Sequence, residues 1–163
     1  MDRHFLKGIG EDDLRAIQTL FEACKDYFIL MTGGSVTSAS AHSLYIQLPE
    51  GKSYKDKHIF GFYEDSELMG VIDAILNYPD DRTLTLGLFL VDPKYKVIGM
   101  KNAYKLLERW CMDQKVSKIR ISAYEILEDE MKFWQEMGFQ PTGQKIEDGD
   151  RAILIMAKSL QRS

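Results

Sequence analysis

The sequence has few of the residues that build metal and disulfide sites. It contains two cysteines and three histidines among 163 residues. Cys24 and Cys111 are far apart and form no C-x-x-C pattern, so we expect both to be reduced core residues. The histidines show no H-x-x-H spacing and no carboxylate or thiol at a ligand-like offset, which predicts that there is no metal site. P-loop, G-x-S-x-G and complete G-x-G-x-x-G patterns are also absent.

The chain also lacks the features of membrane and nucleic-acid-binding proteins. It has no run of about 18 uncharged apolar residues, and its first residues are too polar and acidic for a signal peptide. The 21 basic and 25 acidic residues give a net charge of −4, without the basic excess that binding to phosphate backbones requires. We therefore expect a soluble, cytoplasmic protein that binds neither nucleic acid nor a membrane.

What remains is the composition of an ordinary globular domain, with 45% hydrophobic and 28% charged residues. A chain of this length buries roughly 70% of the surface that its unfolded form exposes, which is enough for a core without disulfides or metal. No internal repeat or linker interrupts it. We expect a single domain over residues 1–163.

Apolar spacings of three and four residues predict helices, and runs of β-branched, aromatic and aliphatic residues between turns predict strands. In chain order these are helices 12–28 and 38–48, strands 58–63, 68–76 and 83–91, helix 99–113, strand 118–123, a short helix from 128, and strands 139–145 and 152–158. The helix between the third and fourth strands makes those two strands parallel. The fold class is α/β (α+β), with a mixed, mostly antiparallel sheet and the order α-α-β-β-β-α-β-α-β-β.

The third strand and the helix after it form the segment with the clearest chemistry. Leu84, Leu86, Leu88 and Leu90 alternate along the strand, and Phe89 and Val91 make its end apolar on both faces. The helix start that follows leaves backbone N–H groups unpaired and attracts anions. Gly99 lets the backbone approach a ligand closely, and a local basic cluster favours a multiply phosphorylated one. The cluster consists of Lys94, Lys96, Lys101 and Lys105. An ordinary strand-to-helix turn with solvated lysines is the alternative.

This segment resembles the GNAT superfamily of N-acetyltransferases. The family signature is a strand ending in V-x-P, followed by Q/R-x-x-G-x-G/A at a helix start. Here it reads Val91-Asp92-Pro93 and then KVIGMK from Lys96 to Lys101. A second family element, a short helix ending in tyrosine or tryptophan and then G-F, matches Trp134 and Gly138-Phe139. The resemblance covers about residues 55–160, and the order of the elements agrees with it.

The resemblance implies a GNAT-like sheet of six to seven strands with about four helices, and acetyl-CoA as co-substrate. The amine of a small molecule, peptide or protein would attack the thioester directly in a ternary complex, and the N–H of Val91 would meet the oxyanion. Backbone groups of residues 89–91 would pair with the pantetheine arm, and amides from Val97 to Asn102 would cradle the pyrophosphate. The implied cofactor contacts are Phe89, Leu90, Val91, Lys96, Val97, Ile98, Gly99, Met100, Lys101, Asn102 and Trp134.

The sequence departs from the family pattern at five positions. Lys96 replaces glutamine or arginine, Lys101 replaces glycine or alanine, Leu127 replaces an asparagine and Glu130 replaces an alanine. Trp134 stands where many members have the tyrosine that protonates the departing thiolate. Indole does not give up its proton at useful pH, so this acid is missing, and Trp134 is a core residue or a wall of the pantetheine channel.

The sequence offers two candidates for the general base and one for a general acid, each with a purely structural alternative. Glu125 follows a strand but is also a typical solvated loop carboxylate, and Asp73 is a base or a residue that satisfies a turn or faces solvent. Tyr124 is an acid or a packing aromatic. Glu125 also belongs to an acidic group with residues 128–130, which either attracts a cationic amine or caps a helix.

Three functions follow in order of preference. The first is an acetyl-CoA-dependent N-acetyltransferase, the second a catalytically degenerate CoA-binding regulatory module, and the third a structural domain without a nucleotide ligand. The family builds its acceptor pocket from the N-terminal helices and from loops that correspond to residues 32–57. The sequence of these segments does not identify the acceptor. A homodimer through the apolar strand at 152–157 is possible, and burial within one subunit explains that strand equally well.

Overall fold

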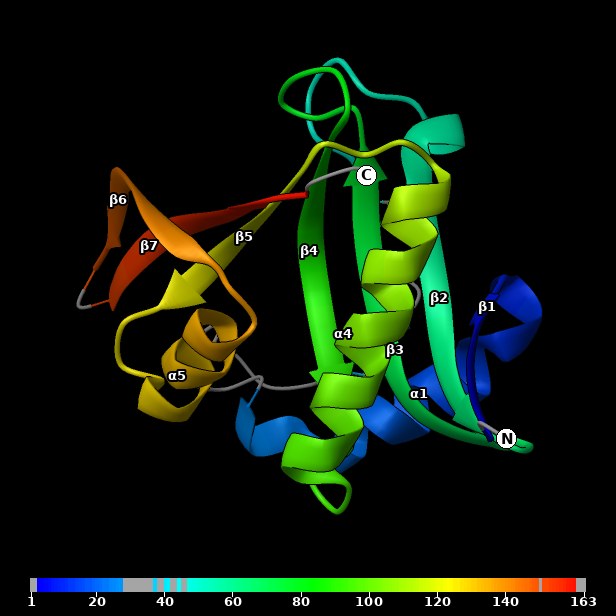
Figure 1. Ribbon diagram of the computed structural model, residues 1–163. Helices are drawn as coiled ribbons and strands as arrows, with labels where there is room; N and C mark the ends of the chain where they lie inside the picture. The colour runs from blue at the N-terminus through cyan, green and yellow to red at the C-terminus, as the bar shows by residue number, and fades with distance from the viewer. Residues whose placement is uncertain are drawn as a thin grey trace.

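Seven strands form one sheet in the computed structural model, which describes residues 3–27, 37, 40–41, 44, 47–149 and 151–160. The strands are β1 (His4–Gly8), β2 (Lys57–Glu64), β3 (Glu67–Leu76), β4 (Thr83–Val91), β5 (Lys118–Tyr124), β6 (Gln140–Asp148) and β7 (Arg151–Ser159). Their order across the sheet is β1-β2-β3-β4-β5-β7-β6 (Figure 1). Neighbouring strands are antiparallel except β4 and β5, which are parallel as the intervening helix predicts.

Helices cover both faces of this sheet. The helices are α1 (Leu14–Ala23), α4 (Lys96–Asp113) and α5 (Glu128–Glu136), with 3-10 turns η1 (Glu11–Asp13) and η2 (Tyr54–Asp56). In Figure 1, α4 lies in front of the sheet and α1 behind it. Two apolar clusters result: one joins α4 and α5 to the sheet around Tyr104, and the other joins α1 to it around Phe21. The mixed α/β architecture predicted from the sequence is confirmed.

A bulge at Gly87 divides β4 between the two clusters. The register with β3 shifts where Asp73 pairs with Leu88 and the next residue pairs with Leu86. Before the bulge, Leu84 and Leu86 face the α4 side, whereas Leu88 and Leu90 face the α1 side. The prediction of one continuous alternating face along β4 is therefore wrong, because an extra residue in a strand inverts the side-chain alternation beyond it.

The structure begins with a strand that the sequence analysis missed. β1 is a five-residue edge strand with mostly exposed side chains, so it carries no alternating apolar signal. Helix α4 starts at Lys96, three residues before the predicted position. Of the predicted helix 38–48, residues 40, 41 and 44 are helical, whereas residues 47 and 48 are not, so the predicted end is too late. Residues 38–39, 42–43 and 45–46 lie outside the described residues, as does the glycine break at 33–35.

Both cysteines are buried and free, as predicted, and burial raises the pKa of each thiol to about 12. Strand β7 lies between β5 and β6, and the fold itself buries Ile155 and Met156. Among the described residues, no helix is long and apolar enough to cross a membrane.

Candidate functional site

The two parallel strands of the sheet separate soon after they begin. The ladder between β4 and β5 joins residues 83–85 to residues 118–120, and Figure 1 shows the strands diverging beyond this point. On the side facing β5, residues 86–91 of β4 therefore border a gap, while on the other side they still pair with β3. A gap at the carboxyl ends of parallel strands is a common location for ligands in α/β proteins.

Strand β4 turns backbone polar groups into this gap. Asp92 donates its N–H to the carbonyl of Met69 at 2.8 Å, so it belongs to a hydrogen-bonded pair. Bonded and non-bonded pairs alternate along an antiparallel ladder. Leu90 therefore turns its polar groups towards β3, whereas Phe89 and Val91 turn theirs towards the gap.

Two contacts agree with this alternation. The carbonyl oxygen of Leu90 lies 2.5 Å from the position of a Cβ on Gly70, which is a residue of β3. The carbonyl of Val91 accepts a long hydrogen bond from the thiol of Cys24 at 4.0 Å, so its partner is a residue outside β3. Of the three residues predicted to pair with an extended ligand, Phe89 and Val91 have the orientation required, and Leu90 is engaged in the sheet.

The start of α4 adds a second set of free donors. Tyr95 precedes the helix, and its carbonyl accepts the N–H of Gly99 at 3.1 Å. The N–H groups of residues 96–98 have no acceptor within the helix, whereas those from Gly99 onward are used by the helical ladder. The predicted cradle from Val97 to Asn102 thus reduces to the first turn, where the helix dipole also favours an anion.

Gly99 is required by packing rather than by an exposed backbone. A Cβ at this position would lie 2.9 Å from the Cβ of Tyr95 and 3.2 Å from a methyl carbon of Val91. The Tyr95 Cβ is fixed to the main chain and cannot rotate away, so a side chain at position 99 would force the backbone to shift. The glycine therefore lets the first turn of α4 sit directly on the end of β4.

We expect Gly99→Ala to destabilise the protein by about 1–3 kcal/mol, because the helix start must shift away from β4. Chemical denaturation measures this loss. Gly8→Ala is the matched control, because a Cβ at Gly8 has no atom within 4 Å. Equal stability of the two variants would show that close packing at Gly99 is unimportant.

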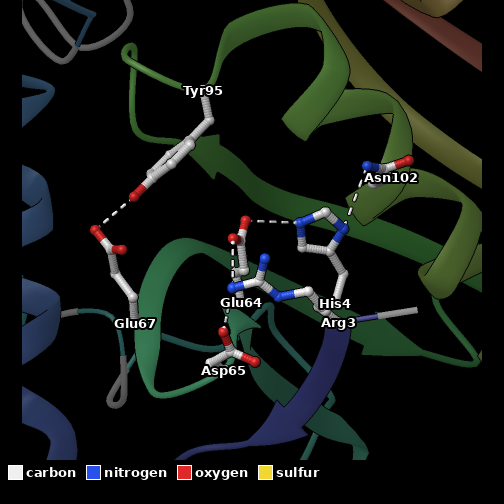
Figure 2. A network of polar contacts seen from close by, with 7 residues as sticks. All are labelled: Arg3, His4, Glu64, Asp65, Glu67, Tyr95 and Asn102. Carbon is white, nitrogen blue, oxygen red and sulfur yellow. Dashed lines mark hydrogen bonds and ion pairs between the residues drawn. The ribbon is translucent and has the colours of Figure 1, made fainter. Parts of the chain in front are cut away.

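Polar side chains fasten the turn before α4 to the hairpin between β2 and β3. Figure 2 shows the hydroxyl of Tyr95 donating a hydrogen bond to Glu67, and the ammonium of Lys94 lies 3.2 Å from the same carboxylate. The Tyr95 hydroxyl and Lys94 hold the pKa of Glu67 below its usual value. These groups are exposed, so they position the turn more than they stabilise the fold.

A second group in Figure 2 ties β1 to the first turns of α4. The ring of His4 lies 3.3 Å from the side-chain amide of Asn102 and 3.1 Å from the carboxylate of Glu64. Arg3 pairs with Asp65 and lies 3.4 Å from Glu64. The edge strand missing from the sequence prediction therefore helps to fix the helix start from which the free N–H groups project.

Two hollows meet beside β4. The first, which we call the strand cavity, measures about 700 Å³ and is bordered by β4, β5 and the segment around residues 37–47. The second, the helix groove, measures about 900 Å³ and runs between the end of β4 and α5. The residues that line both hollows are Tyr27, Phe89, Met100 and Glu130. Ligands in the two hollows would therefore meet at this junction.

A model of the Acetyltransferase (GNAT) family matches residues 15–139 of this sequence. The chain belongs to the GNAT acetyltransferase family. This match confirms the resemblance found at the V-x-P strand end and the G-F element. No curated protein matches the sequence.

Solved structures of the same fold are similar to this GNAT protein over nearly their whole length. An acetyltransferase from Thermus thermophilus has 21% sequence identity and a TM-score of 0.75, with 98% of both chains covered. Spermidine N-acetyltransferase from Vibrio cholerae, in complex with CoA and spermine, has 15% identity and a TM-score of 0.75, with 96% of this chain and 95% of that chain covered. The ribosomal-protein-S18-alanine N-acetyltransferase of Escherichia coli has 14% identity and a TM-score of 0.70, with 98% and 96% covered.

Glu130 is the acidic side chain at the junction of this GNAT protein. It lies in the first turn of α5 and lines both hollows. The hydroxyl of Tyr27 donates a hydrogen bond to it at 3.3 Å. Burial raises the pKa of Glu130 to about 7, although the Tyr27 hydrogen bond opposes the shift. The sequence placed Glu130 in an acidic group that either attracts a cationic amine or caps a helix, and it noted that Glu130 replaces a family alanine.

Asp73 lies in the strand cavity but is held in an ion pair. The ammonium of Lys57 donates a hydrogen bond to Oδ2 at 3.1 Å and lies 3.1 Å from Oδ1. The two side chains are 9% and 4% exposed. Burial raises the pKa of Asp73, and Lys57 opposes this shift. The geometry assigns Asp73 to the wall of the cavity, close to the bulge at Gly87.

The other sequence candidates lie in different surroundings. Glu125 is exposed and lies 3.8 Å from the ammonium of Lys145, whereas Tyr124 lines the strand cavity. Trp134 is buried in an edge-to-face cluster with Phe89, and it also borders the strand cavity.

Charged side chains of the predicted basic cluster are engaged near the helix start. Lys101 lies 3.6 Å from Glu136 of α5, and Glu136 lines the helix groove. Together with the Lys94–Glu67 pair, this contact reduces the local positive charge. Ile98 is 75% exposed in the first turn of α4.

Proposed function

We propose that this protein transfers the acetyl group of acetyl-CoA to a primary amine. In this proposal acetyl-CoA occupies the helix groove and the amine enters through the strand cavity. The observation that carries the proposal is the junction of the two hollows at Glu130, beside the inward-turned polar groups of Phe89 and Val91. Family membership supports the reaction class. The whole chain acts as one domain, with one site at the centre of its sheet.

The chain's own residues fit an extended phosphorylated ligand. The N–H and carbonyl groups of Phe89 and Val91 offer hydrogen bonds to an amide-containing arm, as another strand would. The first turn of α4 offers N–H groups at residues 96–98 to phosphate oxygens. Acetyl-CoA supplies the activated thioester, and the protein supplies orientation and charge stabilisation.

Glu130 serves as the general base in this mechanism. The amine enters as an ammonium ion, loses a proton to the Glu130 carboxylate and attacks the thioester carbonyl. The N–H of Val91 stabilises the developing oxyanion. A carbon–nitrogen bond forms and the carbon–sulfur bond breaks. Of the two protons that the nitrogen loses, one passes to the departing thiolate and the other to solvent. Protonated Glu130 can supply the thiolate's proton, so no tyrosine is needed at the position of Trp134.

Thermal denaturation followed by a thiol-release assay tests this function. Acetyl-CoA at about 100 times its Kd stabilises a protein by about 2.7 kcal/mol, so we expect acetyl-CoA and CoA to raise the melting temperature by several degrees. ATP should have a smaller effect. A panel of primary amines should then release CoA together with stoichiometric N-acetylated product.

Two results would contradict the proposal in different ways. Stabilisation by CoA without thiol release from any amine would favour a catalytically degenerate CoA-binding module. A ligand that binds the folded state must stabilise it. If millimolar acetyl-CoA produced no shift of the melting temperature, both the acetyltransferase and the CoA-binding module would therefore be contradicted.

A further inference from the structure

The bulge in β4 leaves an opening beside the carboxylate of Asp73. Gly87, the residue at the bulge, is exposed and lines the strand cavity together with Asp73. A Cβ at Gly87 would lie 3.0 Å from Oδ2 of Asp73, and the next nearest atoms also belong to Asp73. This separation is an ordinary hydrogen-bond length. The missing side chain therefore leaves room for a ligand atom to contact this carboxylate from the cavity.

The carboxylate of Asp73 has capacity for a further hydrogen bond. Among the described residues its one donor is Lys57, whose ammonium bonds Oδ2 at 3.1 Å and also lies 3.1 Å from Oδ1. Oδ1 is buried and accepts no hydrogen bond in this part of the structure. An ionised carboxylate offers about four lone-pair sites. Asp73 is thus a hydrogen-bond acceptor with unused capacity, in the wall of the cavity through which the amine enters.

The charge of Lys57 determines which kind of donor fits at this opening. Its ammonium also donates to the carbonyl of Gln47 at 2.8 Å, so it is fixed between two acceptors. The Lys57–Asp73 pair has no net charge. A second ammonium beside Oδ2 would lie at most about 6 Å from that of Lys57, and like charges at this distance repel strongly where little water screens them. A neutral donor, such as a hydroxyl or an amide N–H, makes the hydrogen bond without this repulsion.

The register of β3 and β4 sets the length of the ligand. Asp73 pairs with Leu88. Val91 pairs with Gly70, three residues away along both strands. At about 3.4 Å per residue, the carboxylate therefore lies about 10 Å along the sheet from the N–H that meets the oxyanion. One hydrogen bond takes up about 3 Å of this distance, and the remaining length of about 7 Å corresponds to a chain of about four to six carbon atoms.

We propose that the acceptor is a primary amine that carries a neutral hydrogen-bond donor about four to six carbon atoms from the reactive nitrogen. The donor enters the opening at Gly87 and bonds the carboxylate of Asp73, while the amine reaches Glu130 at the junction. Asp73 thereby determines specificity and takes no part in the chemistry. This inference rests on the proposed acetyl transfer.

A series of amines that differ at one end tests the requirement for a neutral donor. The series is 6-aminohexan-1-ol, its methyl ether, heptylamine and 1,6-diaminohexane, each assayed by thiol release. The ether keeps the oxygen but cannot donate. We expect the alcohol to exceed the ether and heptylamine in kcat/KM by about 10- to 100-fold, the range for a hydrogen bond to a charged group. The diamine should also fall below the alcohol.

The length of the chain gives a second readout in the same assay. Ethanolamine is too short to reach Asp73 from the junction, so it should show no advantage over 2-methoxyethylamine. Equal use of 6-aminohexan-1-ol and its ether by the wild type would overturn the inference. A higher kcat/KM for the diamine than for the alcohol, after correction for its two equivalent amines, would overturn the neutral character of the donor.

Gly87→Ala connects the preference to the opening without changing any charge. Its Cβ occupies the space of the donor, so the ratio of kcat/KM for the alcohol to that for the ether should fall towards one. Gly8→Ala is the matched control, because a Cβ there has no atom within 4 Å, and it should keep the wild-type ratio. A Gly87→Ala protein with the wild-type ratio would contradict the placement of the donor.

A double variant tests the carboxylate itself. Lys57→Met/Asp73→Val replaces the buried pair by apolar side chains, which proteins often tolerate, and should also bring the ratio towards one. Lys145→Met/Glu125→Val removes an exposed ion pair elsewhere and should leave the ratio unchanged. If both double variants kept the wild-type ratio, Asp73 would not be the group that binds the donor.

A binding experiment separates failure of this inference from failure of the proposed function. If no amine releases thiol, acetyl transfer is refuted, and the melting temperature is then measured with CoA and the N-acetylated forms of 6-aminohexan-1-ol and of its ether. Greater stabilisation by the acetylated alcohol, lost in Gly87→Ala, would support recognition of a neutral donor at Asp73. Equal stabilisation by the two compounds would overturn it.

Discussion

Glu130→Gln should lower kcat by about 10²- to 10⁴-fold, because a positioned general base contributes this factor and glutamine cannot accept the proton. Binding of acetyl-CoA should stay within about 2-fold of wild type, since glutamine keeps the shape of the side chain and the Tyr27 hydrogen bond. Steady-state kinetics and calorimetric titration measure the two quantities. Glu147→Gln, on an exposed stretch of β6, removes the same charge elsewhere and should leave kcat unchanged.

The pH dependence gives a second signature of the same residue. Burial raises the pKa of Glu130 to about 7, and the base works when deprotonated. Activity should therefore rise with pH through about 7 and fall towards tenfold per unit below it. Other charged groups that line the hollows are Asp73, Arg120, Arg151, Glu128, Asp129, Lys132 and Glu136. If Glu130→Gln retained wild-type kcat or the same acidic limb, Glu130 would not be the base.

Lys57→Met should destabilise the protein by about 3–5 kcal/mol, because it leaves the buried carboxylate of Asp73 without its cation. For a chain of this length the melting temperature should fall by roughly 6–20 °C. Lys145→Met breaks an exposed pair with Glu125 and should cost at most about 1 kcal/mol. The double variant Lys57→Met/Asp73→Asn should recover much of the loss.

The loss in Lys57→Met should also depend on pH in a defined direction. Without Lys57, burial alone acts on Asp73 and raises its pKa further above that of the unfolded chain. Stability is then retained at low pH, where the carboxyl is protonated in both states, and is lost as pH rises towards the folded-state pKa. Denaturation at pH 5 and pH 8 measures the difference. A Lys57→Met protein as stable as wild type at both pH values would refute the structural role of the pair.

The sequence was most informative where a signal repeats along the chain. The periodic apolar residues of 99–113 were sufficient to predict the longest helix. The runs of β-branched, aromatic and aliphatic residues between 58 and 158 were sufficient to predict most of the strands. β1 and the bulge at Gly87 were missed because each depends on pairing with a neighbouring strand. A five-residue exposed edge has no period of its own, and a bulge is visible only against the register of its partner.

In the candidate site, too, features with a local sequence signal were predicted and features that depend on distant segments were missed. The V-x-P strand end and the helix start were apparent from local sequence, and the structure brings them together at the gap beside β5. The role of Glu130 was not apparent from local sequence, because its hydrogen-bond partner Tyr27 lies 103 positions earlier in the chain. The partner of Asp73 was also missed, although the β2–β3 hairpin places Lys57 diagonally across from it. Contacts between distant segments therefore decide the partner of each carboxylate, a hydroxyl for Glu130 and an ammonium for Asp73.

A crystal structure with acetyl-CoA and an unreactive analogue of the amine would show whether the two ligands meet at Glu130. We expect the thioester at the junction of the two hollows, with its carbonyl oxygen within hydrogen-bonding reach of the Val91 N–H, at about 2.7–3.2 Å. The amine position should lie within the same reach of the Glu130 carboxylate, directly or through one water. A thioester bound away from Val91, or an amine position that Glu130 cannot reach, would refute the proposed mechanism.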